Sequence, residues 1–456
     1  MTDAPERLAG IDLARADALY AEEYARYAAA RPRSRALAER LADGFHDGVP
    51  MHWMRDWPTP FPMAVAEARG AGITDVDGHR LADFCLGDTG SMFGHSPEPV
   101  ARAIAAQASR GLTTMLPTPQ AAEVGRLLRQ RFGLPHWQIA TTATDANRFA
   151  LRVARAVTGR AKILVFHGCY HGSVDETFVR LIDGRPAHRP GILGQVVDLT
   201  QNTAVVEFND VPALERALRR QDIACVIAEP VMTNSAMVLP RPGFHQALRR
   251  LTRETGTLLL IDETHTISTG PGGYTGRHGL EPDLFVLGKP IAGGVPASVW
   301  GFTDDVARRF DAARAASPGH SGMGTTLSAN ALALAAMHAT LTEVMTERAY
   351  AHMERLAEAL DAGLAAAIRR AGLPWHVARI GARVEIVFAP QPLVNGSEAE
   401  ATHIAPLERA LHLALLNRGV LIAPFHNMML VSPATSEADV DALVRAFGEV
   451  TGALVA

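Results

Sequence analysis

The stretch 257–289 reads TLLLIDETHTISTGPGGYTGRHGLEPDLFVLGK and contains two short apolar runs. The first run, TLLLI, is followed directly by Asp262, and the second, LFVL, is followed by a glycine and then by Lys289. Short apolar runs bounded by polar and turn-forming residues are typical of buried strands. In an open parallel sheet the functional groups gather beyond the carboxyl ends of the strands. The stretch therefore predicts two buried strands that bring Asp262 and Lys289 to one edge of a sheet.

The same pattern continues on the N-terminal side of this stretch. Ala161–Phe166 (AKILVF) and Ala224–Ala228 (ACVIA) are two further apolar runs, and amphipathic segments at Val211–Arg220 and Gly243–Thr255 lie between the runs. Strands that alternate with helices are typical of a mostly parallel sheet with helices on both faces. We therefore expect an α/β core between about residues 96 and 300.

The rest of the chain differs from this core. Residues 11–45 have helical periodicity, and 51–62 (MHWMRDWPTPFP) form an irregular loop rich in proline. The sequence DVDGH at 75–79 predicts a hairpin turn. A long helical run over 329–369 is followed by an α+β pattern over 374–456.

The bulk composition excludes several classes of protein. A chain of 456 residues predicts two domains. The net charge of -4 argues against nucleic-acid or anionic-membrane partners, and no apolar run approaches the ~20 residues that span a bilayer. The N-terminus lacks the apolar segment of a secretory signal. Cys85, Cys169 and Cys225 have no metal-ligand spacing and indicate reduced thiols in the cytoplasm.

Lysine is very rare in this chain. Of the 44 lysine and arginine residues, 2 are lysines, Lys162 and Lys289, and 42 are arginines. A lysine at a strand end can form an imine once its neighbours lower its pKa. A solvated surface lysine is the ordinary alternative, but the apolar run before Lys289 and the Pro290 and glycines after it disfavour that interpretation.

Two further groups fit the same chemistry. A buried carboxylate at Asp262 suits a pyridinium nitrogen, although a helix-capping acid is the simpler interpretation of this residue alone. The segment Thr141–Asn147 (TTATDAN) opens a helix, where backbone N–H groups and the hydroxyls of Thr142 and Thr144 can bind a phosphate. An ordinary capping cluster would have the same sequence.

Other polar and aromatic residues follow the predicted strands. Tyr170 can stack on a planar cofactor or pack under a loop. Glu229 and Asn234 can reach a ring oxygen or the substrate, and Thr326 can add a phosphate-binding hydroxyl. The chain has 18 histidines but neither an H-E-x-x-H motif nor Cys/His ligand spacing, so we assign no metal.

Together these residues resemble the class III aminotransferases, in particular the glutamate-1-semialdehyde aminomutases and the β-amino-acid aminotransferases. The resemblance extends from about Gly70 to the C-terminus. Its most specific stretches are Gly94–Val100, Phe166–Gly172, Glu229–Phe244, Ile261–Thr266 and Gly279–Lys289.

The resemblance implies the fold-type I architecture of pyridoxal-phosphate (PLP) enzymes. This is an α/β fold with a large, mostly parallel sheet domain and a smaller α+β domain. We expect N-terminal helices and an active-site loop over 1–75 as part of the small domain, a PLP-binding domain over 76–328, and a linking helix with the small domain over 329–456. The resemblance also implies a homodimer with shared active sites.

The resemblance also implies roles for single residues. Lys289 matches the lysine that forms a Schiff base with PLP, and Asp262 matches the partner of the ring nitrogen. Tyr170 matches the stacking aromatic, and Thr326 the threonine that reaches the phosphate of the neighbouring subunit. The residues expected to bind the cofactor are Thr142, Ala143, Thr144, Tyr170, His171, Glu229, Asn234, Asp262, Thr264, His265, Lys289 and Thr326.

Several positions depart from the family pattern. Ala143 replaces a glycine of the phosphate loop, Thr264 replaces the usual valine, and His265 is unusual. Arg55 is the expected carboxylate clamp. The residues expected to shape the substrate pocket are Trp53, Arg55, Trp57, Met92, Phe93 and His426, and the alternative is that the two tryptophans only pack the loop.

The implied activity is transfer of an amino group between an amine or amino-acid donor and a keto-acid or aldehyde acceptor. A glutamate-1-semialdehyde-type aminomutase or an amino-acid racemase on the same scaffold remains open, because all three reactions use the same groups. A nicotinamide dehydrogenase would need G-x-G-x-x-G after an early strand, which is absent. A catalytically silent PLP-fold binding protein is the remaining alternative.

Overall fold

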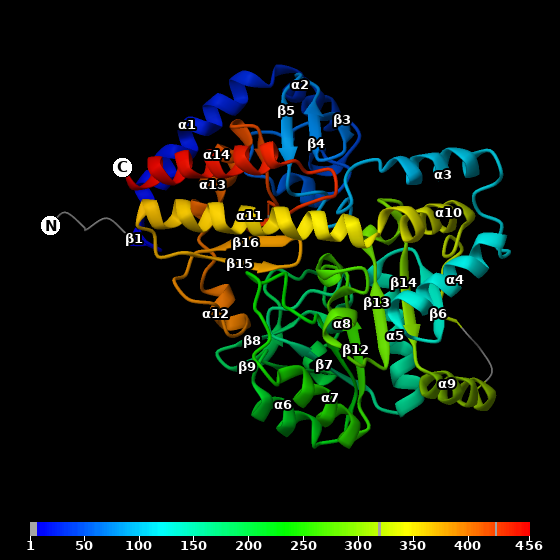
Figure 1. Ribbon diagram of the computed structural model, residues 1–456. Helices are drawn as coiled ribbons and strands as arrows, with labels where there is room; N and C mark the ends of the chain where they lie inside the picture. Colours follow the sequence, from blue (N-terminus) through cyan, green and yellow to red (C-terminus); the bar gives the residue numbers. More distant parts are fainter. Residues whose placement is uncertain (1–6, 318–320, 425) are drawn as a thin grey trace. The chain divides into compact units, whose positions relative to one another are not determined.

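A computed structural model describes residues 7–317, 321–424 and 426–456 (Figure 1). The chain divides into two compact units. The first unit comprises the residues up to 97 together with 348–392 and 402–456, and the second comprises 98–347 and 393–401. Both chain ends therefore belong to the first unit, and the middle of the chain forms the second. Residues 1–6 of the predicted N-terminal segment lie outside the described residues.

A seven-stranded sheet forms the centre of the second unit, in the order β10-β7-β11-β12-β13-β14-β6. Its strands are β6 (His136–Ala140), β7 (Lys162–Phe166), β10 (Thr203–Val206), β11 (Ile223–Ala228), β12 (Leu258–Asp262), β13 (Leu284–Leu287) and β14 (Ser298–Phe302). The strands from β10 to β13 pair in parallel, and β14 pairs antiparallel with both its neighbours. The predicted mostly parallel sheet is confirmed, and the four strands predicted from apolar runs are adjacent in its middle.

Helix α5 (Ala143–Thr158) covers one face of this sheet. Its apolar residues, such as Phe149 and Val153, pack with Leu258 and Leu260 of β12 in one buried cluster. Side chains alternate between the two faces of a strand, so Asp262 points to the same face as Leu258 and Leu260. The end of β12 therefore carries a carboxylate on the face that α5 covers.

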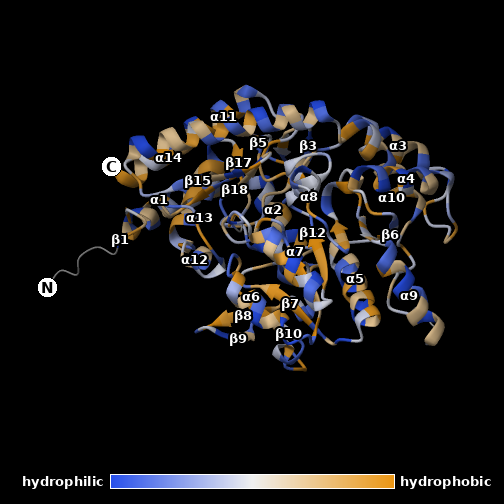
Figure 2. Cartoon of the chain, turned by 60° about the horizontal axis from the view of Figure 1, so that its bottom comes forward, coloured by the Kyte–Doolittle hydropathy of each residue, from blue (hydrophilic) through white to orange (hydrophobic). Residues whose placement is uncertain are grey.

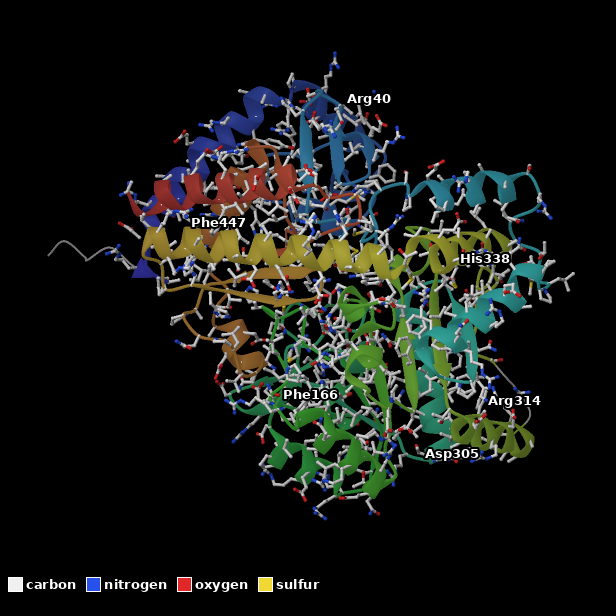
Figure 3. The ribbon with its side chains drawn as sticks, in the orientation of Figure 1. Arg40, Phe166, Asp305, Arg314, His338 and Phe447 are labelled. Carbon is white, nitrogen blue, oxygen red and sulfur yellow. The ribbon has the colours of Figure 1, made fainter. Side chains whose placement is uncertain are left out.

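The face of the sheet opposite to α5 carries aromatic side chains at the end of β7. Phe166, at the end of β7, packs edge-on against Phe208 and against Phe244, which begins α7 (Phe244–Thr255) (Figure 3). The central strands β7, β11, β12 and β13 are mostly apolar, as the orange colour of β7 and β12 shows (Figure 2). Burial on both faces explains why they appear in the sequence as continuous apolar runs.

The other elements of the second unit surround the sheet or extend from it. They are α3 (Glu98–Ala108), α4 (Pro119–Phe132), the hairpin β8 (Val179–Ile182) and β9 (Arg185–His188), α6 (Val211–Leu218), α8 (Gly273–His278), α9 (Asp304–Ala316), α10 (Ala331–Ala339) and α12 (Gly396–Glu400). Single 3₁₀ turns η3 (Asp175–Thr177), η4 (Leu199–Gln201), η5 (Thr266–Thr269) and η6 (Lys289–Ala292) lie in the loops, and a π-helical turn η7 (Thr340–Val344) follows α10.

The first unit contains helices α1 (Leu13–Ala30), α2 (Pro32–Leu41), α11 (Glu347–Ala371), α13 (Ala405–Asn417) and α14 (Glu437–Val455), and the 3₁₀ turns η1 (His46–Gly48) and η2 (His52–Arg55). Its sheets have the orders β17-β5-β4-β3, β15-β16-β18 and β1-β2. Their strands are β1 (Arg7–Leu8), β2 (Ile11–Asp12), β3 (Val65–Arg69), β4 (Gly72–Asp75), β5 (Arg80–Asp83), β15 (His376–Ile380), β16 (Arg383–Val387), β17 (Val420–Leu421) and β18 (Met428–Leu430). Phe447 of α14 lies in the core of this unit (Figure 3).

The predicted hairpin turn at DVDGH is confirmed, because it joins β4 to β5 with Gly78 at φ +95°. The helical run predicted over 329–369 is confirmed apart from one break. The chain leaves its helical path at Met345, between η7 and α11. Arg131 of α4 stabilises this break, since its guanidinium donates to the carbonyl oxygens of Met345 at 2.8 Å and Leu341 at 2.7 Å.

The boundaries of the compact units lie C-terminal to the expected domain boundaries. The units separate at 97/98 and 347/348, against predicted boundaries at 75/76 and 328/329, a difference of 22 and 19 residues. Strand β5 belongs to the small sheet of the first unit, and α10 packs on α3 and α4 of the second. In the described ranges, every helix is too short or too polar to cross a lipid bilayer.

Candidate active site

The two lysines lie on opposite sides of the large sheet, one where the parallel strands begin and the other where they end. Lys162 is the first residue of β7, and its Nζ lies 2.8 Å from Asp222 Oδ2 in a partly exposed ion pair. Lys289 follows the last residue of β13 by two positions. Because β7 and β13 run in the same direction, the start of one and the end of the other lie at opposite edges. Lys289 is therefore the lysine at the carboxyl edge, where ligands bind in such sheets.

The backbone at Lys289 is strained and closely packed. Lys289 has φ +43°, a value that a residue with a side chain seldom adopts unless its surroundings impose it. A Cβ placed on Gly288 would lie 2.7 Å from Ala143 Cβ, so only glycine fits there. The end of β13 and the start of α5 are thus in direct contact, which fixes where the Lys289 side chain leaves the backbone.

Asp262 lies at the end of the neighbouring strand and accepts four hydrogen bonds. Asn147 Nδ2 donates to Oδ2 at 2.9 Å, and His171 Nδ1 lies 3.0 Å from the same oxygen. The backbone N–H and the hydroxyl of Thr264 donate to Oδ1 at 3.1 and 2.6 Å. Burial alone would raise the pKa of Asp262, but these donors outweigh it and hold the pKa below its ordinary value. Asp262 is therefore a buried, ionised carboxylate.

His171 is the charged neighbour of this carboxylate and is itself buried. Burial lowers the pKa of His171, but the Cys169 thiol and Asp262 together raise it to about 10. The pKa of Cys169, raised by burial, is brought below its ordinary value by His171 and Arg180. The geometry thus places a buried imidazole with a raised pKa behind Asp262.

Thr264 joins the two strand ends. Its Oγ1 donates to Asp262 and accepts a hydrogen bond from the backbone N–H of Gly288 at 3.3 Å. The next residue, His265, has its Nε2 2.8 Å from Lys289 Nζ. The loop after β12 therefore contacts the loop after β13 at two points, one of which is the lysine amine.

The N-terminus of α5 lies beside these loops. Thr142 caps the helix, with its side chain accepting from the N–H of Asp145, and the Thr144 hydroxyl accepts from the N–H of Ser173 at 3.1 Å. Any side chain at Gly172 would collide with Thr144. The first N–H groups of a helix have no partners within it and attract anions. The predicted phosphate-binding segment is thus a capped helix start held against the loop after β7.

The remaining predicted cofactor residues surround this edge. Tyr170 is half-buried, with its ring centroid 5.8 Å from the Arg189 guanidinium. Glu229 follows β11 and is buried; it accepts from the backbone N–H of Thr233 at 3.0 Å and from the Asn234 amide at 3.4 Å. Thr326, in contrast, is exposed on the segment between α9 and α10.

The predicted substrate residues Trp53, Arg55, Trp57, Met92, Phe93 and His426 all belong to the first unit. Arg55 lines a pocket of about 520 Å³ that is also lined by Phe45, Met54 and Phe61. One of its guanidinium nitrogens donates to the carbonyl oxygen of Asp47 at 2.8 Å. The side chain of Trp53 is exposed. The lining of this pocket combines the two cations Arg35 and Arg55 with the acids Glu39 and Asp47 and with apolar side chains.

Met92 and Phe93 have the contacts of core residues. They are 0% and 4% exposed, and the Phe93 ring packs edge-on against Tyr350. His426 is buried too, with Nδ1 2.8 Å from Glu385 Oε1. Met92, Phe93 and His426 are thus all buried, and their predicted place in the substrate pocket stays a prediction.

The comparisons with known proteins agree with this geometry. The model of the family described as aminotransferase class-III matches residues 53–450. The chain belongs to the class-III aminotransferase family. Its relatives include a glutamate-1-semialdehyde 2,1-aminomutase 2 of Bacillus thuringiensis (strain Al Hakam), 34% identical over 396 residues, or 84% of this chain and 90% of that one.

Solved structures of class-III relatives superimpose on nearly the whole chain. A glutamate-1-semialdehyde aminomutase from Pseudomonas aeruginosa PAO1 has a TM-score of 0.96 and 51% identity, covering 98% of this chain and 100% of that one. A lysine-to-alanine variant of such an enzyme, 50% identical, was solved in complex with PMP. A β-phenylalanine aminotransferase from Variovorax paradoxus has a TM-score of 0.85 and 30% identity, covering 96% and 97%. The fold is therefore fold-type I, as expected.

The cofactor of this class-III enzyme is PLP, and the residues at the carboxyl edge fit it. Lys289 supplies a primary amine for the aldehyde, and Asp262 an ionised carboxylate for the ring nitrogen. The start of α5, with the hydroxyls of Thr142 and Thr144, supplies donors for the phosphate. Among the described side chains, no group of three or more His, Cys, Asp or Glu residues has the arrangement of a metal site.

Sequence reasoning missed Asn147 and the pairing of Cys169 with His171. Asn147 is fully buried and donates to Asp262 and to the carbonyl oxygen of His171. The signal was present, because Asn147 shares a helical face with Ala146 and Ala150, where an apolar residue is the ordinary choice. A buried amide on such a face indicates a polar partner.

Proposed function

We propose that this enzyme transfers an amino group between an amine or amino-acid donor and a keto-acid or aldehyde acceptor, with Lys289 and Asp262 as its catalytic residues. The observation that carries this proposal is the arrangement of the two strand ends. An amine after β13 and an ionised carboxylate after β12 are joined by Thr264, which contacts both loops.

The roles of the residues follow from their chemistry. PLP, when bound, supplies an electron sink for the pair of electrons left on the substrate carbon. Lys289 would hold the cofactor through its amine, and its free amine would remove a proton from the carbon that bears the substrate nitrogen. Asp262 keeps the ring nitrogen protonated. Thr142, Ala143 and Thr144 bind the phosphate through backbone N–H groups and hydroxyls.

The other cofactor residues act around the ring. Tyr170 stacks on it, and Glu229 with Asn234 orients its polar substituents or the substrate. His171 and Thr264 hold the charge and position of Asp262, and His265 lies at the lysine amine. Arg55 is the proposed clamp for a substrate carboxylate, with Trp53 and Trp57 on the same loop and His426 as a further substrate residue.

The second candidate is an aminomutase that moves the amino group within one substrate. The relatives named glutamate-1-semialdehyde aminomutase favour it, since one is 51% identical over 98% of this chain. Both reactions need the same lysine and the same carboxylate, so the catalytic assignments hold for either.

We further propose a homodimer in which Thr326 reaches the active site of the partner subunit. Thr326 is exposed, and nearby segments carry large exposed apolar side chains, namely Leu112, Met115, Leu116 and Leu327. Ala331 N donates to the carbonyl oxygen of Leu112, which holds these segments together. Apolar groups clustered on a surface mark a protein interface.

We also propose a cytoplasmic location. Cys85, Cys169 and Cys225 are free, buried thiols, which suits a reducing compartment.

The test is the visible absorption spectrum of the purified protein, titrated with amines and amino acids. A bound-cofactor band near ~420 nm that decays to one near ~330 nm on addition of a donor is expected for amino-group transfer. K289A should lose the ~420 nm band and turnover, while K162A, the matched control at the other edge of the sheet, should keep both. A K289A protein that keeps both refutes the proposal. A single substrate converted without any separate acceptor would favour the aminomutase.

A further inference from the structure

His265 and Lys289 form a direct contact at the edge of the sheet. The distance from His265 Nε2 to Lys289 Nζ is 2.8 Å, which is within hydrogen-bond range for two nitrogens. His265 is 6% exposed and lies between Thr264 and the 3₁₀ turn η5, so the loop and the sheet restrict its ring. The contact thus joins two restrained groups, one of which is the proposed catalytic amine.

The chemistry of the two groups restricts how they share protons. An ammonium has three donors and no acceptor, whereas a neutral imidazole has one acceptor nitrogen. Two positive charges at this distance repel each other, so the pair favours holding one proton rather than two. When Lys289 is protonated, His265 is therefore neutral and its Nε2 accepts from the ammonium.

The carboxylates of the same loop are engaged with other donors. Asp262 accepts from Asn147, His171 and Thr264, and its charge faces the cationic ring of His171. Glu263 accepts from the Thr266 hydroxyl and from the N–H groups of Tyr274 and Thr275, away from the lysine. His265 is thus a side chain through which this loop contacts the lysine nitrogen.

We propose that His265 is a positioning residue for Lys289, whose ammonium it anchors by accepting a hydrogen bond. The inference rests on the proposed function, in which Lys289 transfers the proton. When Lys289 removes the substrate proton, the electron pair of the broken C–H bond stays with the carbon and the amine becomes an ammonium. One of its three N–H groups then donates to His265 Nε2. This bond holds the ammonium in place after it has taken up the proton.

The scarcity of lysine allows a direct test in the full-length protein freed of cofactor. Acetylation with acetic anhydride at a series of pH values, read by mass spectrometry, gives a titration midpoint for each of the two lysines. H265M removes the acceptor, and H265Q retains an acceptor that does not take up a proton. We expect the midpoint of Lys289 to fall by about one pH unit in H265M, the size of a lost charge-assisted hydrogen bond, and to stay close to the wild-type value in H265Q.

Lys162 is the internal control, because its ion pair with Asp222 lies at the other edge of the sheet and its midpoint should be the same in all three proteins. In the cofactor-loaded enzyme, H265M should also increase the kinetic isotope effect of an α-deuterated donor, because proton removal becomes slower. A Lys289 midpoint that is unchanged or raised in H265M, or that falls equally in H265Q, overturns the proposal. The labelling needs no cofactor, so its outcome is separate from the spectroscopic test of Lys289.

Discussion

His171 Nδ1 lies 3.0 Å from Asp262 Oδ2, and both side chains are buried. The carboxylate of Asp262 therefore has a cationic partner that belongs to the protein, since the pKa of His171 is raised to about 10. The ring nitrogen of the cofactor would meet a carboxylate whose pKa is held below its ordinary value before binding. Preorganised charge of this kind avoids reorganisation during the reaction.

Replacing His171 tests this arrangement. H171F removes the donor, so the pKa of Asp262 should rise and its charge should weaken. A hydrogen bond to a charged group contributes about 1.5–3 kcal/mol, and we expect cofactor affinity to fall by about 10- to 100-fold. Fluorescence titration of the cofactor-free protein measures this. H412N is the control. His412 is also buried but belongs to the first unit, so this change should leave the cofactor affinity unchanged.

Thr264 should contribute to the stability of the second unit. T264V keeps the shape of the side chain and removes the hydroxyl that bonds Asp262 and the N–H of Gly288. The buried N–H of Gly288 would then lack this acceptor, at a cost of about 1–3 kcal/mol. We expect the thermal midpoint of the cofactor-free protein to fall by several degrees, and T451V, whose hydroxyl donates within a helix, to have a smaller effect. Equal midpoints for T264V and wild type would show that the hydroxyl does not support the two loops.

Gly288 and Ala143 should behave as a matched pair. G288A places a methyl group 2.7 Å from Ala143 Cβ and should destabilise the protein by about 1–3 kcal/mol, as overpacked sites do. In A143G/G288A the contact between the two methyl groups is absent, so part of the stability should return in chemical denaturation. G270A is the control, because Gly270 has extended backbone and no described atom lies within 4 Å of its would-be Cβ. Additive effects of the two changes would show that the contact is not the cause.

The sequence predicted which strand ends form this site, but not the residues that contact Asp262 and Lys289 from other elements. Asp262 and Lys289 could be placed together because each lies at or within two residues of the end of a buried strand, and neighbouring parallel strands end on the same side of the sheet. Asn147 and Cys169 could not be placed there, since their roles depend on how α5 and the loop after β7 pack on the sheet. The contact of His265 with Lys289 depends in the same way on the path of two loops.

The break in the predicted helical run has a similar cause. The helical run over 329–369 is uniform in composition, and the break at Met345 depends on Arg131, a residue more than 200 positions earlier. Met92 and Phe93, predicted as pocket residues, are both buried, and the composition of the segment does not give that burial. Local pattern therefore predicts the elements, while tertiary contacts decide which side chains reach the site.

Stability should depend on pH through His245. Burial lowers the pKa of His245 to about 4, and its Nε2 lies 2.8 Å from the carbonyl oxygen of Pro230. The unfolded chain binds this proton near pH 6.5, so between about pH 6.5 and 4 the unfolded state binds more protons and stability falls as the pH falls. We expect a loss of about 3 kcal/mol from this residue, measured as the difference in pH dependence between wild type and H245Q. If H245Q loses stability over this range as steeply as the wild type, His245 is not the residue responsible.

The proposed dimer makes a prediction about both assembly and cofactor binding. Met115 and Leu116 are 78% and 72% exposed, and the chain turns sharply at Met115, so the two side chains project from the surface. Two glutamates in their place, M115E/L116E, would bring charges that an apolar interface cannot accept without a large desolvation cost. We expect sedimentation analysis to show a monomer.

If Thr326 completes the phosphate site of the partner subunit, the M115E/L116E monomer should also bind PLP more weakly, although every residue at its own carboxyl edge is unchanged. L8E/V455E is the control, because Leu8 and Val455 are also exposed apolar residues but lie near the two chain ends. This control should remain dimeric and keep its cofactor affinity. A M115E/L116E protein that is monomeric with full cofactor affinity would separate the two ideas, because it would place the interface at residues 112–116 and remove Thr326 from the site.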